Sequence, residues 1–168
     1  MKPAATIASI VLLGLAAGSA QAIESLVDGA YELDSDTITS TSPDTLVSTT
    51  VVLNEGTGAW NCAVTASADS INPLSGDDNR YIFGLSVDTT ASTRSGSDRT
   101  IDHDRLSTAE EVDRVAVTSA FVFKGLSSNA GRNSHVFRWS ARKVNSSDAN
   151  MVVDDSSIAV VCSDYPDN

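Results

Sequence analysis

Apolar and polar residues alternate one by one along much of the chain after residue 23, which is the period of a β-strand and not of a helix. The clearest example is the segment 80–88, in which Tyr81, Phe83, Leu85 and Val87 fall on one face. Eight segments carry strand character, and we predict strands at residues 30–34, 46–54, 60–67, 80–88, 115–124, 135–144, 151–153 and 158–162. The chain is therefore predicted to be all-β.

The connections between these segments are irregular in length and rich in turn-forming residues. The longest spans residues 89–111, and its only helical signal is the capping box Ser107-Thr108-Ala109-Glu110, which predicts one helical turn at most. No repeat of fixed length is present, which disfavours a propeller or a solenoid. Seven or eight strands with one long loop are typical of an antiparallel β-sandwich, and we predict a single jelly-roll-like domain over residues 23–168.

The first 22 residues have the pattern of a secretory signal peptide. Lys2 gives a short positive region, residues 4–15 are apolar, and Ala20-Gln21-Ala22 offers the small residues that a signal peptidase requires. The apolar stretch is too short to cross the ~30 Å of a bilayer core. We therefore predict a bacterial exported protein, cleaved between Ala22 and Ile23, that is periplasmic or extracellular and not inserted in the membrane.

The chain has two cysteines, Cys62 and Cys162, and an even pair in an oxidising compartment predicts a disulfide. The alternation of side chains along each strand supports this pairing, because each cysteine shares a strand face with large apolar residues and would point into the core. The alternative is a redox-active or metal-binding thiol pair, but there is no C-x-x-C spacing and no histidine beside either cysteine.

The balance of charge limits the partners of this domain. The full chain has a net charge of −11, and removal of Lys2 with the leader leaves 10 Lys and Arg against 22 Asp and Glu, or −12. Such a field repels nucleic acid and anionic lipid, so neither is a predicted partner. The acidic surface itself says more about solvation than about chemistry.

Short clusters of acidic residues are the only candidates for a metal site, and the cation that their oxygens would favour is Ca²⁺. The weak candidates are Asp77, Asp78, Asp102, Asp104, Asp154 and Asp155, with His103 between two of them. None matches a calcium-binding loop pattern, and we favour the alternative that they are solvated acidic turns. No other cofactor is predicted.

No catalytic set is recognisable. A G-x-S-x-G elbow is absent, and no nucleophile lies near His and Asp in a known arrangement. Trp60 and Trp139 fall in phase with core residues, whereas Tyr31 and Tyr165 are candidates for stacking on a sugar if they are exposed. We predict that the protein is not an enzyme, with paired carboxylates of a glycosidase as an arrangement that sequence leaves open.

The last third of the chain resembles the closing strands of complement-type globular heads and tumour-necrosis-factor-like jelly rolls found in small exported bacterial proteins. The resemblance rests on Phe121-Val122-Phe123, on the segment 135–141, and on the acidic turn and final strand at 154–161. It implies a non-catalytic binding or assembly module, often trimeric. No functional residue can be carried over from it.

Three functions follow from these features. The first is an exported, non-enzymatic β-sandwich with a structural, assembly or binding role at the cell exterior. The second is a carbohydrate- or Ca²⁺-dependent binding module, and the third is a small secreted hydrolase. The expected partner is a protein or a glycan, and the sequence leaves open whether the chain also forms a homo-oligomer.

Overall fold

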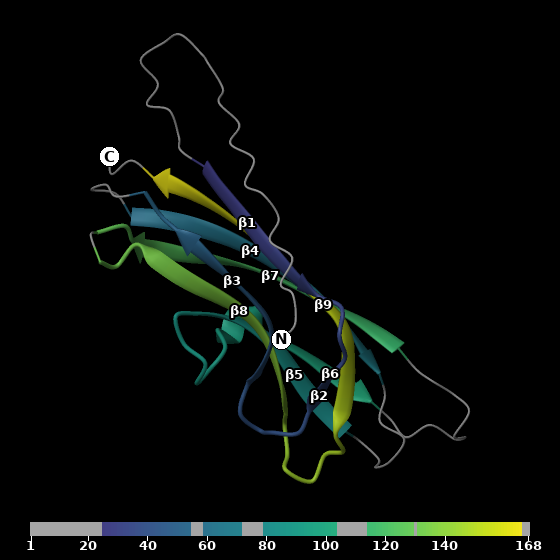
Figure 1. Cartoon of the computed structure of the whole chain (residues 1–168). Helices are drawn as coiled ribbons and strands as arrows, with labels where there is room; N and C mark the ends of the chain where they lie inside the picture. The colour runs from purple at the N-terminus through teal and green to yellow at the C-terminus, as the bar shows by residue number, and fades with distance from the viewer. Residues whose placement is uncertain (1–24, 55–58, 72–78, 104–113, 130, 166–168) are drawn as a thin grey trace.

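A computed structural model describes residues 25–54, 59–71, 79–103, 114–129 and 131–165 (Figure 1). The elements in these ranges are β1 (Ser25–Glu32), β2 (Asp36–Ile38), β3 (Asp44–Val52), β4 (Ala59–Ile71), β5 (Asn79–Val87), η1 (a 3₁₀ turn, Ser95–Ser97), β6 (Arg99–His103), β7 (Arg114–Ser127), β8 (Ser134–Lys143) and β9 (Met151–Tyr165). All strand pairs are antiparallel and form two sheets, so the predicted β-sandwich is confirmed.

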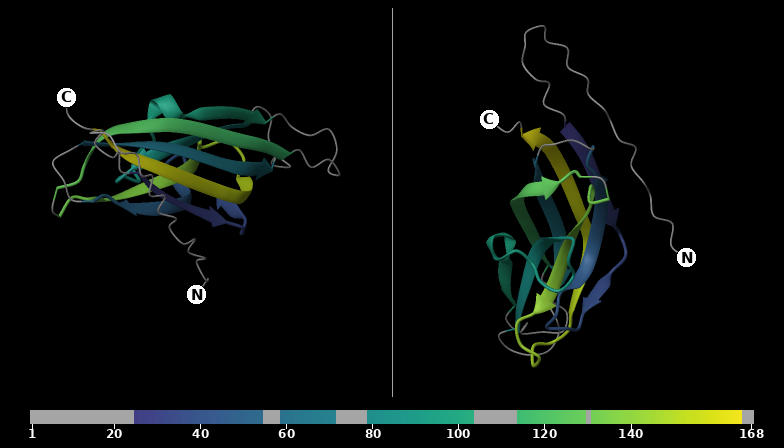
Figure 2. Two further views of the ribbon diagram at one scale, coloured as in Figure 1. Left: turned by 90° about the horizontal axis from the view of Figure 1, so that it is seen from above. Right: turned by 90° about the vertical axis from the view of Figure 1, so that its left-hand side faces the viewer.

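The two sheets are built from nested strand pairs. Sheet A has the order β1-β9-β4-β7, with β2 also on β9, and sheet B has the order β3-β8-β5-β6. The strands pair as β1 with β9, β3 with β8, β4 with β7, and β5 with β6, which is one long hairpin rolled up on itself. This is the strand order of a jelly roll. The left view of Figure 2 shows β7, β4, β9 and β1 of sheet A side by side.

The core lies between the sheets and is filled by the alternate residues of each strand. Trp60 and Trp139 are 2% and 0% exposed, so the prediction that both tryptophans are core residues is confirmed. Phe123 of sheet A and Phe137 of sheet B meet edge to face, with ring centroids 5.7 Å apart. Such contacts add to the burial of apolar area and fix how the two layers pack.

Sequence patterns located the strands well where one face is aromatic, and less well elsewhere. The two short strands predicted at residues 151–153 and 158–162 are one continuous strand, β9. Asp155, with a φ of 38°, lies where the register shifts between β9 and β4, so the polar segment 154–157 stays in the sheet. Strands β2 and β6 fall in segments that were predicted to be loops.

The segment after β5 protects an exposed strand edge. The hydroxyl of Ser97 accepts a hydrogen bond from Leu85 N at 2.8 Å, and the carbonyl oxygen of Leu85 accepts one from Arg94 N at 2.7 Å. A Cβ at Gly84 would lie 2.3 Å from Asp98 Oδ1, so only glycine lets this segment approach. Edge protection of this kind prevents uncontrolled strand pairing between molecules.

The sequence predictions that lie outside the described residues include the signal peptide at 1–22, its cleavage site, and the capping box at 107–110. In the part of the chain that the structure describes, no helix is long and apolar enough to cross a membrane.

Candidate functional site: the outer face of sheet A

The outward residues of sheet A form three rows that cross the four strands β1, β9, β4 and β7. We name them the valine row (Val27, Val161, Ala63, Val122), the small row (Gly29, Ala159, Thr65, Ala120) and the hydroxyl row (Tyr31, Ser157, Ser67, Thr118). Each row lists the residues in the order β1, β9, β4, β7, and each neighbour in a row is a direct partner across the strands. The rows follow from strand alternation, because their members are two residues apart along each strand.

These twelve positions carry no charged residue in a chain with a net charge of −11. The side chains are nevertheless open to solvent: Val27, Val122 and Val161 are 53%, 47% and 46% exposed, and Tyr31 is 46% exposed. Single exposed apolar residues are ordinary, but a contiguous uncharged patch across a whole sheet is typical of an interaction surface.

A groove of about 690 Å³ crosses this face along the small and hydroxyl rows. The valine row does not line it and stands beside it as a ridge. Tyr31 lies toward the β1 end of the groove, and Arg99, at the start of β6, lies at the β7 end. The floor is low because its residues have small side chains. At Gly29 there is no side chain at all, and a Cβ there would meet the carbonyl oxygen of Ile158 at 2.9 Å.

Charged residues return immediately beyond the uncharged rows, with opposite sign at the two ends. Lys124 is the next outward residue of β7 beyond the valine row. Beyond the hydroxyl row, Asp69 of β4 lies opposite Asp154 of β9. Asp154 forms an ion pair with Arg114 at 3.1 Å and accepts a hydrogen bond from the hydroxyl of Ser35. The face is thus uncharged in its centre, basic at one end and mainly acidic at the other.

Cys62 and Cys162 lie on the opposite, inner face of the same sheet. They are direct partners on β4 and β9, both fully buried, with sulfur atoms 1.99 Å apart. The distance between the two sulfur atoms is that of a disulfide, as the sequence predicts. Both side chains also point to the inner face of the sheet, as the alternation along each strand predicts. The bond joins the two central strands of sheet A, which support the outward rows.

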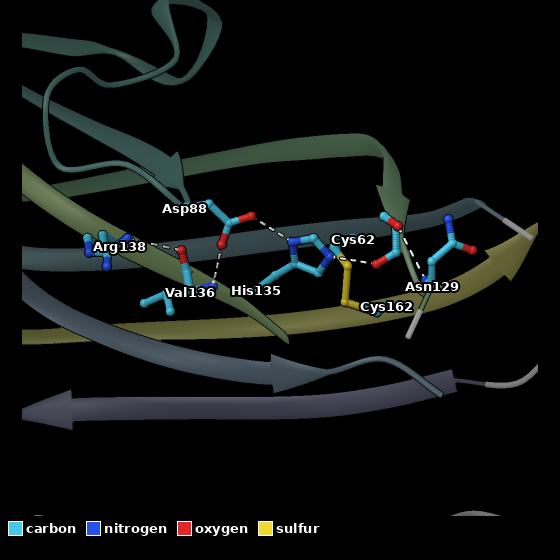
Figure 3. A network of polar contacts seen from close by, with 8 residues as sticks. Cys62, Asp88, Asn129, His135, Val136, Arg138 and Cys162 are labelled. Carbon is cyan, nitrogen blue, oxygen red and sulfur yellow. Dashed lines mark hydrogen bonds and ion pairs between the residues drawn. A yellow bond between two sulfur atoms is a disulfide. The ribbon is translucent and has the colours of Figure 1, made fainter. Parts of the chain in front are cut away.

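His135 contacts a carboxylate, but its surroundings are those of a structural clamp (Figure 3). Its Nε2 donates to the carbonyl oxygen of Ser127 at 2.8 Å, and its Nδ1 lies 2.7 Å from Asp88 Oδ2. The other carboxylate oxygen of Asp88 accepts from Val136 N at 2.9 Å. With the residue 7% exposed and both ring nitrogens bonded, His135 of β8 links the end of β7 to Asp88, directly after β5.

A buried tyrosine in the inner layer of sheet B is bonded to the turn before β9. The Tyr81 hydroxyl donates to the carbonyl oxygen of Ala149 at 2.8 Å. Burial, and secondarily the nearby Asp148 carboxylate, raises the pKa of Tyr81 to about 12. Both effects disfavour the phenolate, so the folded protein holds this side chain in its neutral form.

The three predicted acidic metal candidates that the structure describes do not gather at one place. Asp102 on β6 pairs with Arg80 at 3.1 Å, at the far sheet from Asp154 and Asp155. Asp77, Asp78 and Asp104 lie outside the described residues. Among the residues that are described, no three His, Cys, Asp or Glu side chains gather into a metal-binding group. The Ca²⁺ site therefore stays a prediction of the sequence.

Of the two tyrosines named as sugar-stacking candidates, Tyr31 is exposed and lies in the groove. Sequence reasoning missed the three rows themselves. One signal pointed to them: Val160-Val161 and Phe121-Val122-Phe123 are apolar on both strand faces, which is unusual for a strand with one face in water.

No protein-family model matches this chain, and no curated protein matches it either. The resemblance of residues 121–161 to complement-type and tumour-necrosis-factor-like domains therefore stays a prediction, as does the trimeric state that it implies.

Proposed function

We propose that this is an exported, non-catalytic β-sandwich protein with an assembly or binding role at the cell exterior, and that it docks through the outer face of sheet A. The observation that carries the proposal is the uncharged, solvent-exposed centre of that face in a strongly acidic protein. Interfaces are depleted of charge at their centre and charged at their rim, and the three rows with Lys124 and Asp69 around them have this arrangement.

The chemistry elsewhere in the described residues supports a role without catalysis. The His135–Asp88 pair has the residue types of an acid–base pair, but the second ring nitrogen is used by a backbone carbonyl and water has little access. A general base needs a free nitrogen within reach of a substrate proton. His135 instead acts as a tie between segments.

The test compares where the exported protein goes when one outward valine is changed. Wild type is expected in complexes heavier than the free chain, whether with a second copy or with the cell-surface fraction, whereas Val161→Glu is expected as free chain, because it places a charge at the centre of the face. Val52→Glu is the matched control, since Val52 is 58% exposed on β3 of the other sheet. The same distribution for all three proteins would contradict the proposal.

A second candidate function, carbohydrate binding, is favoured by Tyr31. Its exposed ring lies in the groove with the hydroxyls of Ser67, Ser157 and Thr118 and with Arg99. An aromatic face with nearby polar groups suits the apolar and hydroxyl-bearing faces of a sugar. A glycan array with wild type and Tyr31→Ala, each with and without EDTA, tests this and the Ca²⁺ prediction together. If neither protein binds any glycan, with or without EDTA, both carbohydrate binding and the Ca²⁺ prediction are contradicted.

A further inference from the structure

We infer that the partner of the outer face of sheet A is a second copy of this chain, bound face to face about a two-fold axis that runs across the strands. The inference rests on the proposed docking role of that face and names its occupant. The two features that support it are the ridge-and-groove relief of the face and the opposite charges at its ends.

The relief of the face is self-complementary. The valine row is a ridge with three exposed β-branched side chains, and the neighbouring small row is the floor of a groove. Both features cross the same four strands and lie one outward residue apart. The ridge of one copy therefore has the length and direction needed to enter the groove of another. Interdigitation of this kind is how sheets pack face to face, about 10 Å apart.

Only one orientation of the two-fold axis joins ridge to groove. An axis along the strands would place the valine row of one copy on the valine row of the other, and the grooves would stay empty. An axis across the strands, between the valine and small rows, reverses the strand direction of the second copy. Each ridge then meets the other copy's groove, and the contact is made twice by the same residues, as an isologous interface requires.

The charges at the two ends fit this same orientation. Reversing the strand direction places Lys124 of one copy over the hydroxyl row of the other, one outward residue short of Asp69. The long lysine side chain can then approach an acidic partner at both ends of the interface. An axis along the strands would instead bring the two Lys124 ends to one side of the interface and the two acidic ends to the other, so that lysine and aspartate would not meet. Charge at the rim selects orientation in this way, while the uncharged centre avoids burying an unpaired charge.

The size of the face sets the expected strength of the dimer. With strands ~4.8 Å apart and ~3.4 Å per residue, the four strands between Lys124 and Ala116 cover about 500 Å² per copy, or about 1,000 Å² in total before side-chain relief is counted. This is the lower limit for a specific interface. We expect a reversible dimer with a dissociation constant of about 1–100 µM, and not a permanent one.

Sedimentation velocity of the exported wild-type protein over a range from about 1 to 500 µM measures this equilibrium. The expected result is a monomer–dimer transition in that range. Val161→Glu is expected to weaken it at least about tenfold, because a carboxylate would enter the apolar groove of the partner. Val52→Glu has the same change of residue on the other sheet and is expected to match wild type.

Two further variants keep the result interpretable. Val122→Thr on the edge strand β7 exchanges a methyl for a hydroxyl of the same shape, so it tests the ridge even if Val161→Glu fails to fold. A weakening of a few-fold is expected.

Lys124→Glu is expected to weaken the dimer, and adding Asp69→Lys in the same chain is expected to restore it. Restoration depends on the strand-reversed orientation and would not follow from a general effect of charge.

The outcomes separate this inference from the function on which it rests. A strict monomer at all concentrations, with surface retention still dependent on Val161, overturns the second copy and leaves the docking role standing. A monomer that binds in the glycan array, with binding lost in Tyr31→Ala, assigns the groove to a sugar and also overturns the inference. A dimer unaffected by Val161→Glu and Val122→Thr lies elsewhere on the protein and contradicts it as well. A monomer whose retention ignores Val161 overturns both proposals.

Discussion

The inner and outer faces of sheet A are both rich in small and apolar residues, yet only the inner face has a partner in the structure. On β9, Ile158, Val160 and Cys162 point inward and are 0–2% exposed, whereas Val161, between two of them, points outward and is 46% exposed. The inner residues are covered by sheet B. The apolar side chains of β9 therefore have two roles: those on the inner face stabilise the fold, and those on the outer face are available to contact a second molecule.

The largest expected effect of breaking an inward contact concerns the disulfide. Replacing Cys62 and Cys162 with alanine removes a link between residues 100 apart in the sequence. The unfolded chain then gains conformational freedom, and the free energy of unfolding should fall by about 4–5 kcal/mol. Urea unfolding of the exported protein with and without reductant measures the change. Equal stability of the oxidised and reduced proteins would show that the bond does not support the inner face.

The next largest expected effect is the pH dependence of stability that results from burial of Tyr81 on the inner face of sheet B. The pKa of Tyr81 is about 12 in the folded protein and about 10 in an unfolded chain. Between these values the unfolded chain loses the phenol proton and the folded protein keeps it, so stability falls as pH rises. The loss should reach about 2 kcal/mol near pH 12. The loss vanishes about one pH unit below the unfolded pKa, near pH 9.

Tyr81→Phe is the control for this pH dependence, because it removes the titrating group. Urea unfolding between pH 9 and 12 should give a shallower loss of stability for Tyr81→Phe than for wild type. Identical slopes would mean that Tyr81 titrates alike in the folded and unfolded states, and that it is not buried as the structure places it.

The smallest expected effect compares the two faces at adjacent residues of one strand, Val160 and Val161. Val160→Ala should lower the free energy of unfolding by about 2 kcal/mol, since it removes two buried methyl groups and leaves a cavity. Val161→Ala should cost less than about 1 kcal/mol, since Val161 is already about half exposed to water. Thermal unfolding of dilute protein measures both. A larger cost at Val161 would reverse the assignment of the two faces.

The extent to which sequence predicts this molecule depends on how local each feature is. The strands around Trp60, Phe83 and Trp139, and the inward direction of both cysteines, follow from alternation within a single segment. Strand β6 could not be predicted in this way, because Arg99–His103 has one apolar residue and is held by its pairing with β5. Pairing over such distances is tertiary information.

The candidate site was out of reach for the same reason. Val27, Ala63, Val122 and Val161 are scattered through the sequence, and only the register of four strands places them in one row. A shift of one residue in any strand would send its member to the core. Residue types alone therefore gave acidic clusters as candidates, whereas the arrangement in space gives an uncharged face.

Whether a second copy covers the outer face of sheet A in solution can be measured from the access of solvent to valine methyl groups. In methyl-labelled exported protein, a soluble paramagnetic agent relaxes the methyl signals that water reaches. As the protein is concentrated from a few micromolar to several hundred, the signals of Val27, Val122 and Val161 are expected to become protected while that of Val52 stays accessible. Equal accessibility of all four valines at every concentration would contradict it.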